Sequence, residues 1–247
     1  MSERTRTKHT SVGREVLLIV GVALVLSVLV RTFVAQAFFV PSSSMEDTLR
    51  VQDRILASKV TTRFSGVERG EVVVFTDPSD WLPEPVPVDG VRGLIVDALT
   101  FVGLLPADTG EDLVKRVIGI EGDRVVCCDA RGRIVLNGVG LDETYLKPGG
   151  GTDQVRFDVT VPAASVFVMG DNRGDSADSR FHLDENSGGV PVGNVVGRVV
   201  AVIWPVDHWS TQPIPDIFAD PALDAAAGAG SGEEAAPTAT GEAEPGP

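Results

Sequence analysis

The chain opens with one long apolar segment and then changes to short apolar runs. Residues 16–30 carry no charged side chain, and apolar residues continue after the single Arg31. A membrane-spanning helix needs about 20 residues, so the uncharged run alone is short. If Arg31 extends its charged end to the membrane surface, the helix can continue to about Phe33 or Ala35. The pattern predicts one transmembrane helix, which we assign to residues 16–36.

A cleavable export signal would share this layout of a basic start followed by an apolar run. Residues 34–37 resemble a small-x-small cleavage site only weakly, so we favour an uncleaved anchor. Before the segment, basic residues outnumber acidic ones: Arg4, Arg6, Lys8 and Arg14 against Glu3 and Glu15. The positive-inside rule then keeps residues 1–15 in the cytoplasm. We expect a single-pass protein of the cell membrane, with the chain after about residue 36 outside the cytoplasm.

From Val51 onward, short β-branched runs alternate with Gly, Pro and Asp. Such runs are typical of strands, here predicted over residues 53–60, 71–76, 113–120, 124–128, 134–136, 155–161, 166–169 and 195–203. They do not alternate with helical patterns, which argues against a parallel sheet with crossover helices. The predicted fold is mainly β, an antiparallel coiled-sheet or barrel-like domain preceded by the single helix.

Two segments depart from the strand pattern. Residues 81–112 begin rich in proline and continue with helical apolar spacing at 91–105, and we interpret them as an insertion. This insertion would lie on the membrane or fill part of the core. Residues 213–247 are rich in Ala, Gly, Pro and Glu and contain no Lys or Arg, so they should form a disordered acidic tail.

The charge and the metal-binding residue types limit the partners. The formal net charge is −14 over 247 residues, which argues against nucleic acid as a partner. Cys127 and Cys128 are the only cysteines, and either a disulfide between neighbours or two thiols fits the sequence. The three histidines lack the spacing of a zinc site, so we expect no metal and no cofactor.

A serine cluster, residues 42–44, follows the apolar segment directly. Ser44 with Asp47 also fits a helix-capping pattern, so the cluster alone does not establish a nucleophile. A serine hydroxyl is weakly nucleophilic at neutral pH and needs an adjacent general base. The case for catalysis therefore depends on a partner base elsewhere in the chain.

Lysine is the better candidate for that base, because His9 should be cytoplasmic and His182 would need an orienting acid. Lys115 lies in an apolar run, where strand alternation places it on the same face as Leu113 and Val117. Burial there would lower the pKa of the lysine and let the neutral amine act as a base. The alternative is that Lys115 extends past the apolar face and pairs with an acid.

A polar segment, residues 170–180, follows the predicted strand 166–169. It could be an ordinary polar turn, and a calcium loop fits less well because the acids lack the required spacing. In a catalytic site, a hydroxyl of this segment would aim the lysine amine and its Asp/Arg pairs would stiffen the loop.

These segments together resemble the bacterial type I signal peptidases over residues 15–210. Five motifs occur in the family order: Pro41–Leu49, Asp53–Leu56, Arg69–Phe75, Lys115–Gly119 with Gly122–Asp123, and Gly170–Arg173 with Ser176 and Asp178–Arg180. Each motif alone is weak, whereas five in order behind an outward-facing anchor are specific. There are two departures, since Asp47 replaces a usual proline and Gly174–Asp175 replaces a usual Asp-Asn pair.

The resemblance implies a membrane-bound serine endopeptidase in which Ser44 is the nucleophile and Lys115 is the general base. The backbone N–H of Ser44 and the hydroxyl of Ser42 would form the oxyanion hole. The supporting residues would be a hydroxyl that orients the lysine and a salt-bridged scaffold: Ser176, and Asp178 with Arg116, Arg173 or Arg180.

The implied substrates are the signal peptides of secretory preproteins, cut after small residues at −3 and −1. Such a peptide would lie extended and pair with strand edges, while small pockets select Ala-like side chains. The implied substrate-binding residues are Phe38, Val40, Met45, Leu113 and Val114. The lipid bilayer is the second expected partner.

The family fold implies a catalytic β domain from residues 37–122 and 163–212, with an inserted β subdomain at 123–162. A self-cleaving repressor would share a Ser/Lys dyad on a related β scaffold, but the anchor and the missing DNA-binding segment count against it. From a different class, the chain could be an anchored β domain that binds partners, or an inactive homologue.

Overall fold

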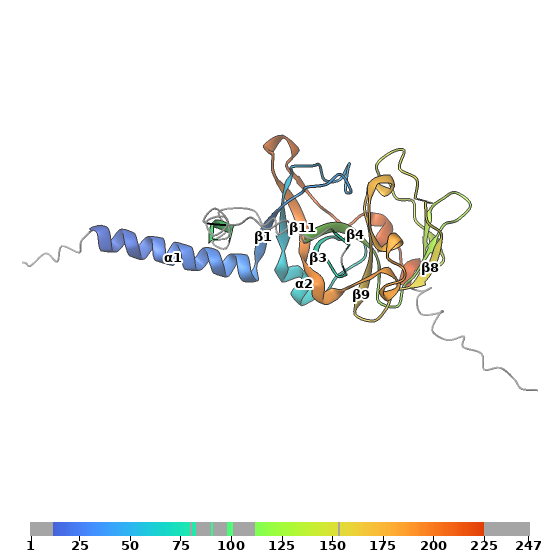
Figure 1. Ribbon diagram of the computed structural model, residues 1–247, viewed down its shortest axis with the longest axis horizontal. Coiled ribbons are helices and arrows are strands. Elements are labelled where there is room, and N and C mark those ends of the chain that lie inside the picture. The colour runs from blue at the N-terminus through green and yellow to red at the C-terminus, as the bar shows by residue number, and fades with distance from the viewer. Residues whose placement is uncertain are drawn as a thin grey trace, which may run out of the picture.

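The computed structural model describes residues 12–79, 81–82, 90, 98–100, 112–152 and 154–224. One long helix leads into a β domain of two sheets and projects away from that domain (Figure 1). Most of the predicted insertion 81–112, including nearly all of its helical pattern, lies outside the described residues, as does the tail beyond residue 224.

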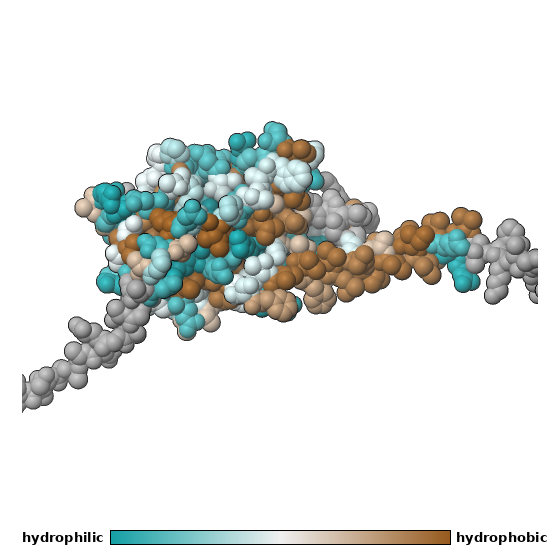
Figure 2. All heavy atoms as spheres, turned by 180° about the vertical axis from the view of Figure 1, so that it is seen from behind, coloured by the Kyte–Doolittle hydropathy of each residue, from teal (hydrophilic) through white to brown (hydrophobic). Residues whose placement is uncertain are grey.

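Helix α1, Val12–Phe33, is apolar along its length and has no buried residue. Figure 2 shows this helix as a largely apolar rod outside the β domain. Among the described residues, it is the one helix long and apolar enough to cross a membrane. It ends at Phe33, so residues 35 and 36, which the sequence pattern assigns to the membrane helix, belong instead to a strand.

The larger sheet has the strand order β1-β2-β11-β3-β4-β9-β10, with β12 paired to β11. All of its pairings are antiparallel, which confirms the predicted mainly β, antiparallel fold. Its strands are β1 (Ala35–Phe39), β2 (Arg54–Ser58), β3 (Val72–Thr76), β4 (Asp112–Ile120), β9 (Ser165–Met169), β10 (Gly189–Pro191), β11 (Val195–Trp204) and β12 (Ser210–Thr211).

The smaller sheet lies at the opposite end of the β domain from α1 (Figure 1). Its antiparallel order is β7-β6-β5-β8: Val139–Gly140, Ile134–Leu136, Arg124–Cys127 and Phe157–Thr160. Val125 of this sheet and Phe167 of the larger one belong to the same buried core cluster, so the two sheets pack together. Cys127 and Cys128 form a disulfide, one of the two states that fit the sequence.

The strand predicted over residues 53–60 is shorter than expected and gives way to a helix. Strand β2 ends at Ser58, and helix α2 follows at Lys59–Ser65. The Ser58 hydroxyl accepts a hydrogen bond from the Thr61 N–H and caps the helix. This cap favours a helix start in a run whose β-branched residues had suggested a strand.

Short 3-10 helices occupy the connections after β9: η1 (Arg173–Asp175), η2 (Ser179–Phe181), η3 (Asn186–Gly188), η4 (Val192–Asn194), η5 (Val206–His208) and η6 (Asp216–Ala219). The prediction of a disordered tail from residue 213 is wrong for its first part. Phe218 and Leu223 are buried in the core cluster shared by the two sheets. These two apolar side chains attach residues 214–224 to the β domain.

Candidate active site

Ser44 lies in the loop between β1 and β2, shortly after the end of α1. Val40, Met45 and Leu49 of the same loop are buried in one core cluster, so the loop is anchored on both sides of Ser44. Ser44 itself is 7% exposed, whereas Ser42 is exposed. The two hydroxyl oxygens lie 3.2 Å apart. The exposed Ser42 hydroxyl therefore lies beside the buried hydroxyl of Ser44.

Lys115 lies in β4, and its flanking residues Leu113 and Val117 belong to one buried cluster, as strand alternation predicts. The lysine side chain is 3% exposed. Its Nζ lies 2.7 Å from Ser44 Oγ and 3.2 Å from the Val114 carbonyl oxygen. No carboxylate of the described residues forms an ion pair with Lys115. The structure therefore brings together the two residues predicted to be catalytic.

Burial lowers the pKa of Lys115 from its ordinary value of 10.5 to about 8. The negative charges of Asp178 and Asp171 oppose this shift, and the positive charge of Arg180 adds to it. A lysine with this pKa is neutral in about a tenth of molecules at pH 7 and in more of them as the pH rises. The neutral amine can accept the proton of the Ser44 hydroxyl across the 2.7 Å that separates them.

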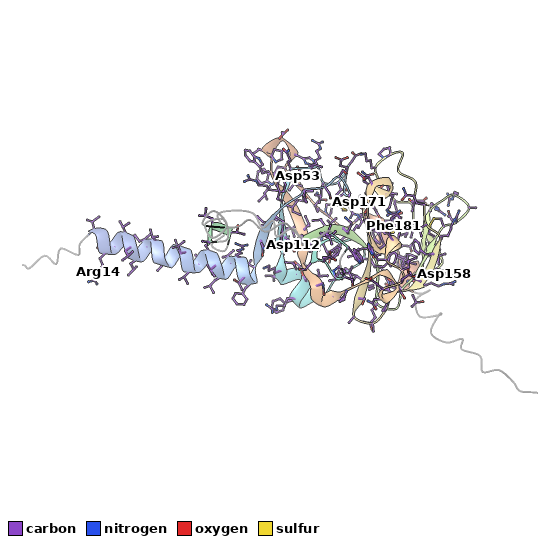
Figure 3. All side chains as sticks on the ribbon, in the orientation of Figure 1. Arg14, Asp53, Asp112, Asp158, Asp171 and Phe181 are labelled. Atoms are coloured by element: carbon purple, nitrogen blue, oxygen red, sulfur yellow. A yellow bond between two sulfur atoms is a disulfide. The ribbon has the colours of Figure 1, made fainter. Side chains whose placement is uncertain are left out.

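The loop that carries Ser44 rests on the polar segment after β9. The Asn172 N–H donates a hydrogen bond to the Ser44 carbonyl oxygen at 3.0 Å. The Thr48 hydroxyl donates to a carboxylate oxygen of Asp171, which Figure 3 labels. Gly170 permits this close approach, because a Cβ there would lie 2.5 Å from the Ser44 carbonyl oxygen. These contacts thus fix the Ser44 loop against the polar segment after β9.

Ser176, predicted to orient the lysine, donates its hydroxyl hydrogen bond to Asp178 at 2.7 Å. No hydrogen bond joins Ser176 to Lys115 in the part of the chain that the structure describes. Arg180 donates to both carboxylate oxygens of Asp178, at 2.8 and 2.9 Å. Burial acts to raise the pKa of Asp178, but the hydrogen bonds and charge of Arg180 outweigh it and lower that pKa. Asp178 is therefore an ionised, fixed neighbour of the lysine.

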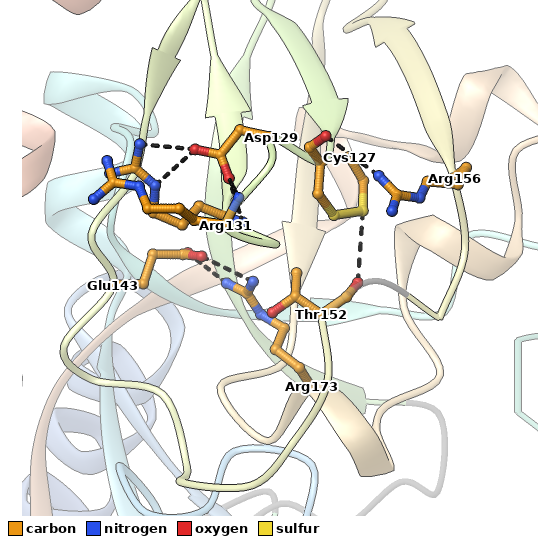
Figure 4. The surroundings of a disulfide bond; sticks show 9 residues. Cys127, Asp129, Arg131, Glu143, Thr152, Arg156 and Arg173 are labelled. Carbon is orange, nitrogen blue, oxygen red and sulfur yellow. Dashed lines mark hydrogen bonds and ion pairs between the residues drawn. A yellow bond between two sulfur atoms is a disulfide. The ribbon is translucent and has the colours of Figure 1, made fainter.

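The other two arginines offered as partners of Asp178 bind different acids. Arg116 donates to both carboxylate oxygens of Asp171, at 2.9 and 2.7 Å. Arg173 donates to both carboxylate oxygens of Glu143 (Figure 4). The sequence placed Asp171 in one of the family motifs but gave it no role of its own, and it did not indicate Glu143 at all. These acids could have been sought in the sequence because a buried arginine requires a carboxylate partner.

Glu143 and Tyr145 lie between β7 and β8, in the part of the chain that forms the smaller sheet. The Tyr145 hydroxyl donates to Glu143, and the Arg116 guanidinium lies 4.2 Å from the centre of the Tyr145 ring. Burial, followed by the charge of Glu143, raises the pKa of Tyr145 well above its ordinary value. This segment therefore braces the two arginines behind the Ser44 and Lys115 pair.

The predicted substrate-binding residues fall into two groups. Phe38, Val40 and Met45 form one core cluster, against which Val114 packs, whereas Leu113 belongs to a separate cluster. Strand β1 pairs only with β2 among the described residues. Residues 112–115 of β4 pair only with β3 within the described ranges, because pairing of β4 with β9 begins at residue 116. Two strand edges near Ser44 therefore have no strand partner within the described part of the chain.

The chain matches the family model described as "Signal peptidase, peptidase S26" over residues 13–204. It belongs to this family. It is 38% identical over 232 residues to the probable signal peptidase I of Mycobacterium leprae (strain TN), covering 82% of this chain and 80% of the relative. It is 36% identical over 234 residues to signal peptidase I of Mycobacterium tuberculosis (strain CDC 1551 / Oshkosh), covering 84% and 78%.

Among solved structures, the chain is similar to a signal peptidase I from Enterococcus faecalis V583, with 25% sequence identity and a TM-score of 0.34. That match covers 53% of this chain and 95% of the other. Family membership confirms the resemblance stated from the motifs and the assignment of the chain as a peptidase.

The two departures from the usual motifs lie close to contacts that hold the Ser44 loop of this peptidase. Asp175 accepts a hydrogen bond from the Ser43 hydroxyl. Glu46, next to Asp47, forms an ion pair with Lys147 at 2.7 Å. Side-chain contacts from two other loops therefore brace the segment in which a proline is absent.

Proposed function

We propose that this peptidase removes signal peptides from exported preproteins, with Ser44 as the nucleophile and Lys115 as the general base. The single observation that supports this most strongly is the 2.7 Å separation of Lys115 Nζ and Ser44 Oγ in a buried site. The lowered pKa of the lysine, about 8, supports its action as a base.

In the first half of the reaction, the neutral Lys115 amine takes the hydroxyl proton of Ser44. The serine oxygen attacks the carbonyl carbon of the scissile peptide bond. The Ser42 hydroxyl and the Ser44 N–H donate to the oxyanion that forms, an interaction whose loss typically lowers the rate by about 10² to 10³. The Lys115 ammonium then protonates the departing amine, and an ester to Ser44 remains.

In the second half, a water molecule loses a proton to Lys115 and attacks the ester carbonyl. The signal peptide leaves as a carboxylic acid, and the proton returns to the Ser44 oxygen. A lysine suits both halves because it alternates between amine and ammonium without leaving its place. The segment from Glu143 to Tyr145 and the Asp178–Arg180 pair keep that place fixed.

We propose that the substrate lies extended along the free edges of β1 and β4, close to Val40 and Val114. Backbone pairing would provide affinity for many sequences, and the packed side chains around Met45 would leave room only for Ala-like residues at −3 and −1. This arrangement accounts for broad recognition of signal peptides with strict selection of small residues.

The proposed location is the cell membrane, with α1 as a single-pass anchor and the N-terminus in the cytoplasm. The catalytic domain would then lie outside, with Ser44 close to the membrane surface where signal peptides emerge. The apolar, unburied surface of α1 supports this placement, and the basic residues that precede the helix support its orientation.

Purified full-length chain in detergent, mixed with one exported preprotein, tests the proposal. The unmodified chain should release a mature product whose new N-terminus follows an Ala-x-Ala-like sequence. Ser44→Ala should leave the precursor intact, while Ser79→Ala, which changes an exposed serine outside the site, should cleave normally. Full cleavage by Ser44→Ala would exclude the mechanism. Binding of the precursor without cleavage by the unmodified chain would favour a non-catalytic binding domain.

A further inference from the structure

Helix α2 is attached to the end of the membrane helix. The Lys59 N–H, at the start of α2, donates a hydrogen bond to the Val34 carbonyl oxygen at 2.9 Å. Val34 in turn donates its N–H to the carbonyl oxygen of Val30, in the last turns of α1. Any bilayer that holds α1 must therefore end beside α2, whatever the rest of the domain contacts.

A groove of about 410 Å³ lies at this junction. Its lining combines cationic and hydroxyl groups with an apolar wall: Lys59, Arg63, Thr32 and Thr62, with Val192, Val195 and Val196. Such a lining offers hydrogen-bond donors, positive charge and hydrocarbon within one groove. A phospholipid, whose phosphate is bonded to an apolar tail through glycerol, has the same arrangement.

The groove carries positive charge from Lys59 and Arg63. Neither Lys59 nor Arg63 forms an ion pair with any residue that the structure describes. Burial lowers the pKa of Lys59, and the positive charge of Arg31 lowers it further, while Asp112 acts in the opposite direction. Lys59 and Arg63 line the groove, and Arg31, in the last turn of α1, adds a third positive charge that acts on Lys59. A bound anion would relieve their repulsion.

The exposed face of α2 is apolar as well as basic. Phe64 is 82% exposed and Val60 is also exposed. A single exposed apolar residue is ordinary on a protein surface. Here it lies on a helix that carries Lys59 and Arg63 and begins at the membrane boundary. Basic and aromatic side chains together are typical of segments that bind at the interface of anionic membranes.

We infer that this groove binds the headgroup phosphate of an anionic phospholipid in the outer leaflet, with Phe64 entering the boundary between headgroups and acyl chains. The inference rests on the membrane anchoring proposed above, but not on the catalytic mechanism. Bound lipid would fix the rotation of the catalytic domain about α1 and so hold Ser44 at a constant height above the bilayer.

Native mass spectrometry of the full chain, released from detergent that contains phosphatidylglycerol or phosphatidylcholine, tests this inference. The unmodified chain should retain phosphatidylglycerol several-fold more often than phosphatidylcholine. Lys59→Gln/Arg63→Gln should lose that preference. The control Arg131→Gln/Arg156→Gln removes two exposed cations from the far end of the domain and should keep it. Equal retention of both lipids by the unmodified chain, or an unchanged preference in the groove variant, would overturn the inference.

Two further measurements separate lipid binding from other causes. Inorganic phosphate alone should give far fewer adducts than phosphatidylglycerol, because it lacks the chain that contacts the valines; equal numbers would show an adventitious anion site and contradict the inference. Cleavage of a soluble signal-sequence peptide in lipid-free detergent should be unchanged in the groove variant. That activity reports correct folding, and its absence in the unmodified chain would contradict the proposed catalysis while leaving the lipid preference measurable.

Discussion

Two lysines near the Ser44 loop lie in opposite surroundings. Lys115 is 3% exposed, with its Nζ between Ser44 Oγ and the Val114 carbonyl oxygen. Lys147 has a side chain 37% exposed, and its Nζ lies 2.7 Å from a carboxylate oxygen of Glu46. Both residues are fixed by contacts to the same loop, but only one of them has an acid as its direct partner.

The two environments shift the pKa in opposite directions. Burial lowers the pKa of Lys115 to about 8, whereas the hydrogen bond to Glu46 raises the pKa of Lys147. Lys115 can therefore exchange a proton near neutral pH, and Lys147 remains an ammonium that holds a loop. The direct neighbours of an amine decide whether it acts as a base or as a structural cation.

The largest expected effect is the difference in cleavage activity between variants of the two lysines. Lys115→Met should lower kcat/KM for preprotein cleavage by about 10⁴-fold, because removal of a general base also removes the activation of the nucleophile. Lys147→Met should change it by less than about threefold, since an exposed ion pair contributes little. Steady-state cleavage assays on both variants, with circular dichroism as a check of folding, measure this contrast. Comparable losses in the two variants would show that Lys115 has no special chemical role.

A smaller effect, on stability, should distinguish Glu143, the acid that pairs with Arg173 near the site, from Glu46, the acid that pairs with Lys147. Glu143 is buried and binds Arg173, while Glu46 is more exposed and binds Lys147. Glu143→Gln should lower the free energy of unfolding by about 3 kcal/mol, because it leaves a buried guanidinium without its counter-charge. Glu46→Gln should lower it by less than about 1 kcal/mol. Denaturant titration followed by tryptophan fluorescence gives both values, and equal losses would contradict the distinction.

Much of this arrangement could be predicted from local sequence. Strand alternation around Lys115 identified a dry face, and the order of short β-branched runs identified an antiparallel β fold. Both features depend on neighbouring residues, so they are visible in the sequence. The prediction of a strand through residue 60 was wrong, because the Ser58 cap stabilises a helix start that outweighs the strand preference of the residues after it.

The charge pairing behind the site could not be predicted in the same way. Three arginines were candidates for Asp178, and only Arg180, two residues away, binds it. Arg116 binds Asp171 and Arg173 binds Glu143, across 55 and 30 residues of sequence. Such pairings depend on how the loops meet in three dimensions. Family motifs named the arginines but not Glu143, the acid between β7 and β8.

The smallest expected difference between the unmodified chain and Lys147→Met lies in the pH dependence of cleavage, whose midpoint should be set by Lys115 alone. Because the amine must be neutral to accept a proton, kcat/KM should rise about tenfold per pH unit and level off above the lysine pKa. With that pKa at about 8, the midpoint of the rise should lie near pH 8. Lys147→Met should keep the same midpoint, since Lys147 stays charged throughout this range. The rate of cleavage of a soluble peptide, measured from about pH 5 to about pH 10, gives the profile for the unmodified chain and for Lys147→Met. The range extends to the ordinary pKa of a lysine, about 10. A midpoint near that ordinary value would mean that Lys115 is hydrated in the working enzyme and that burial does not set its charge.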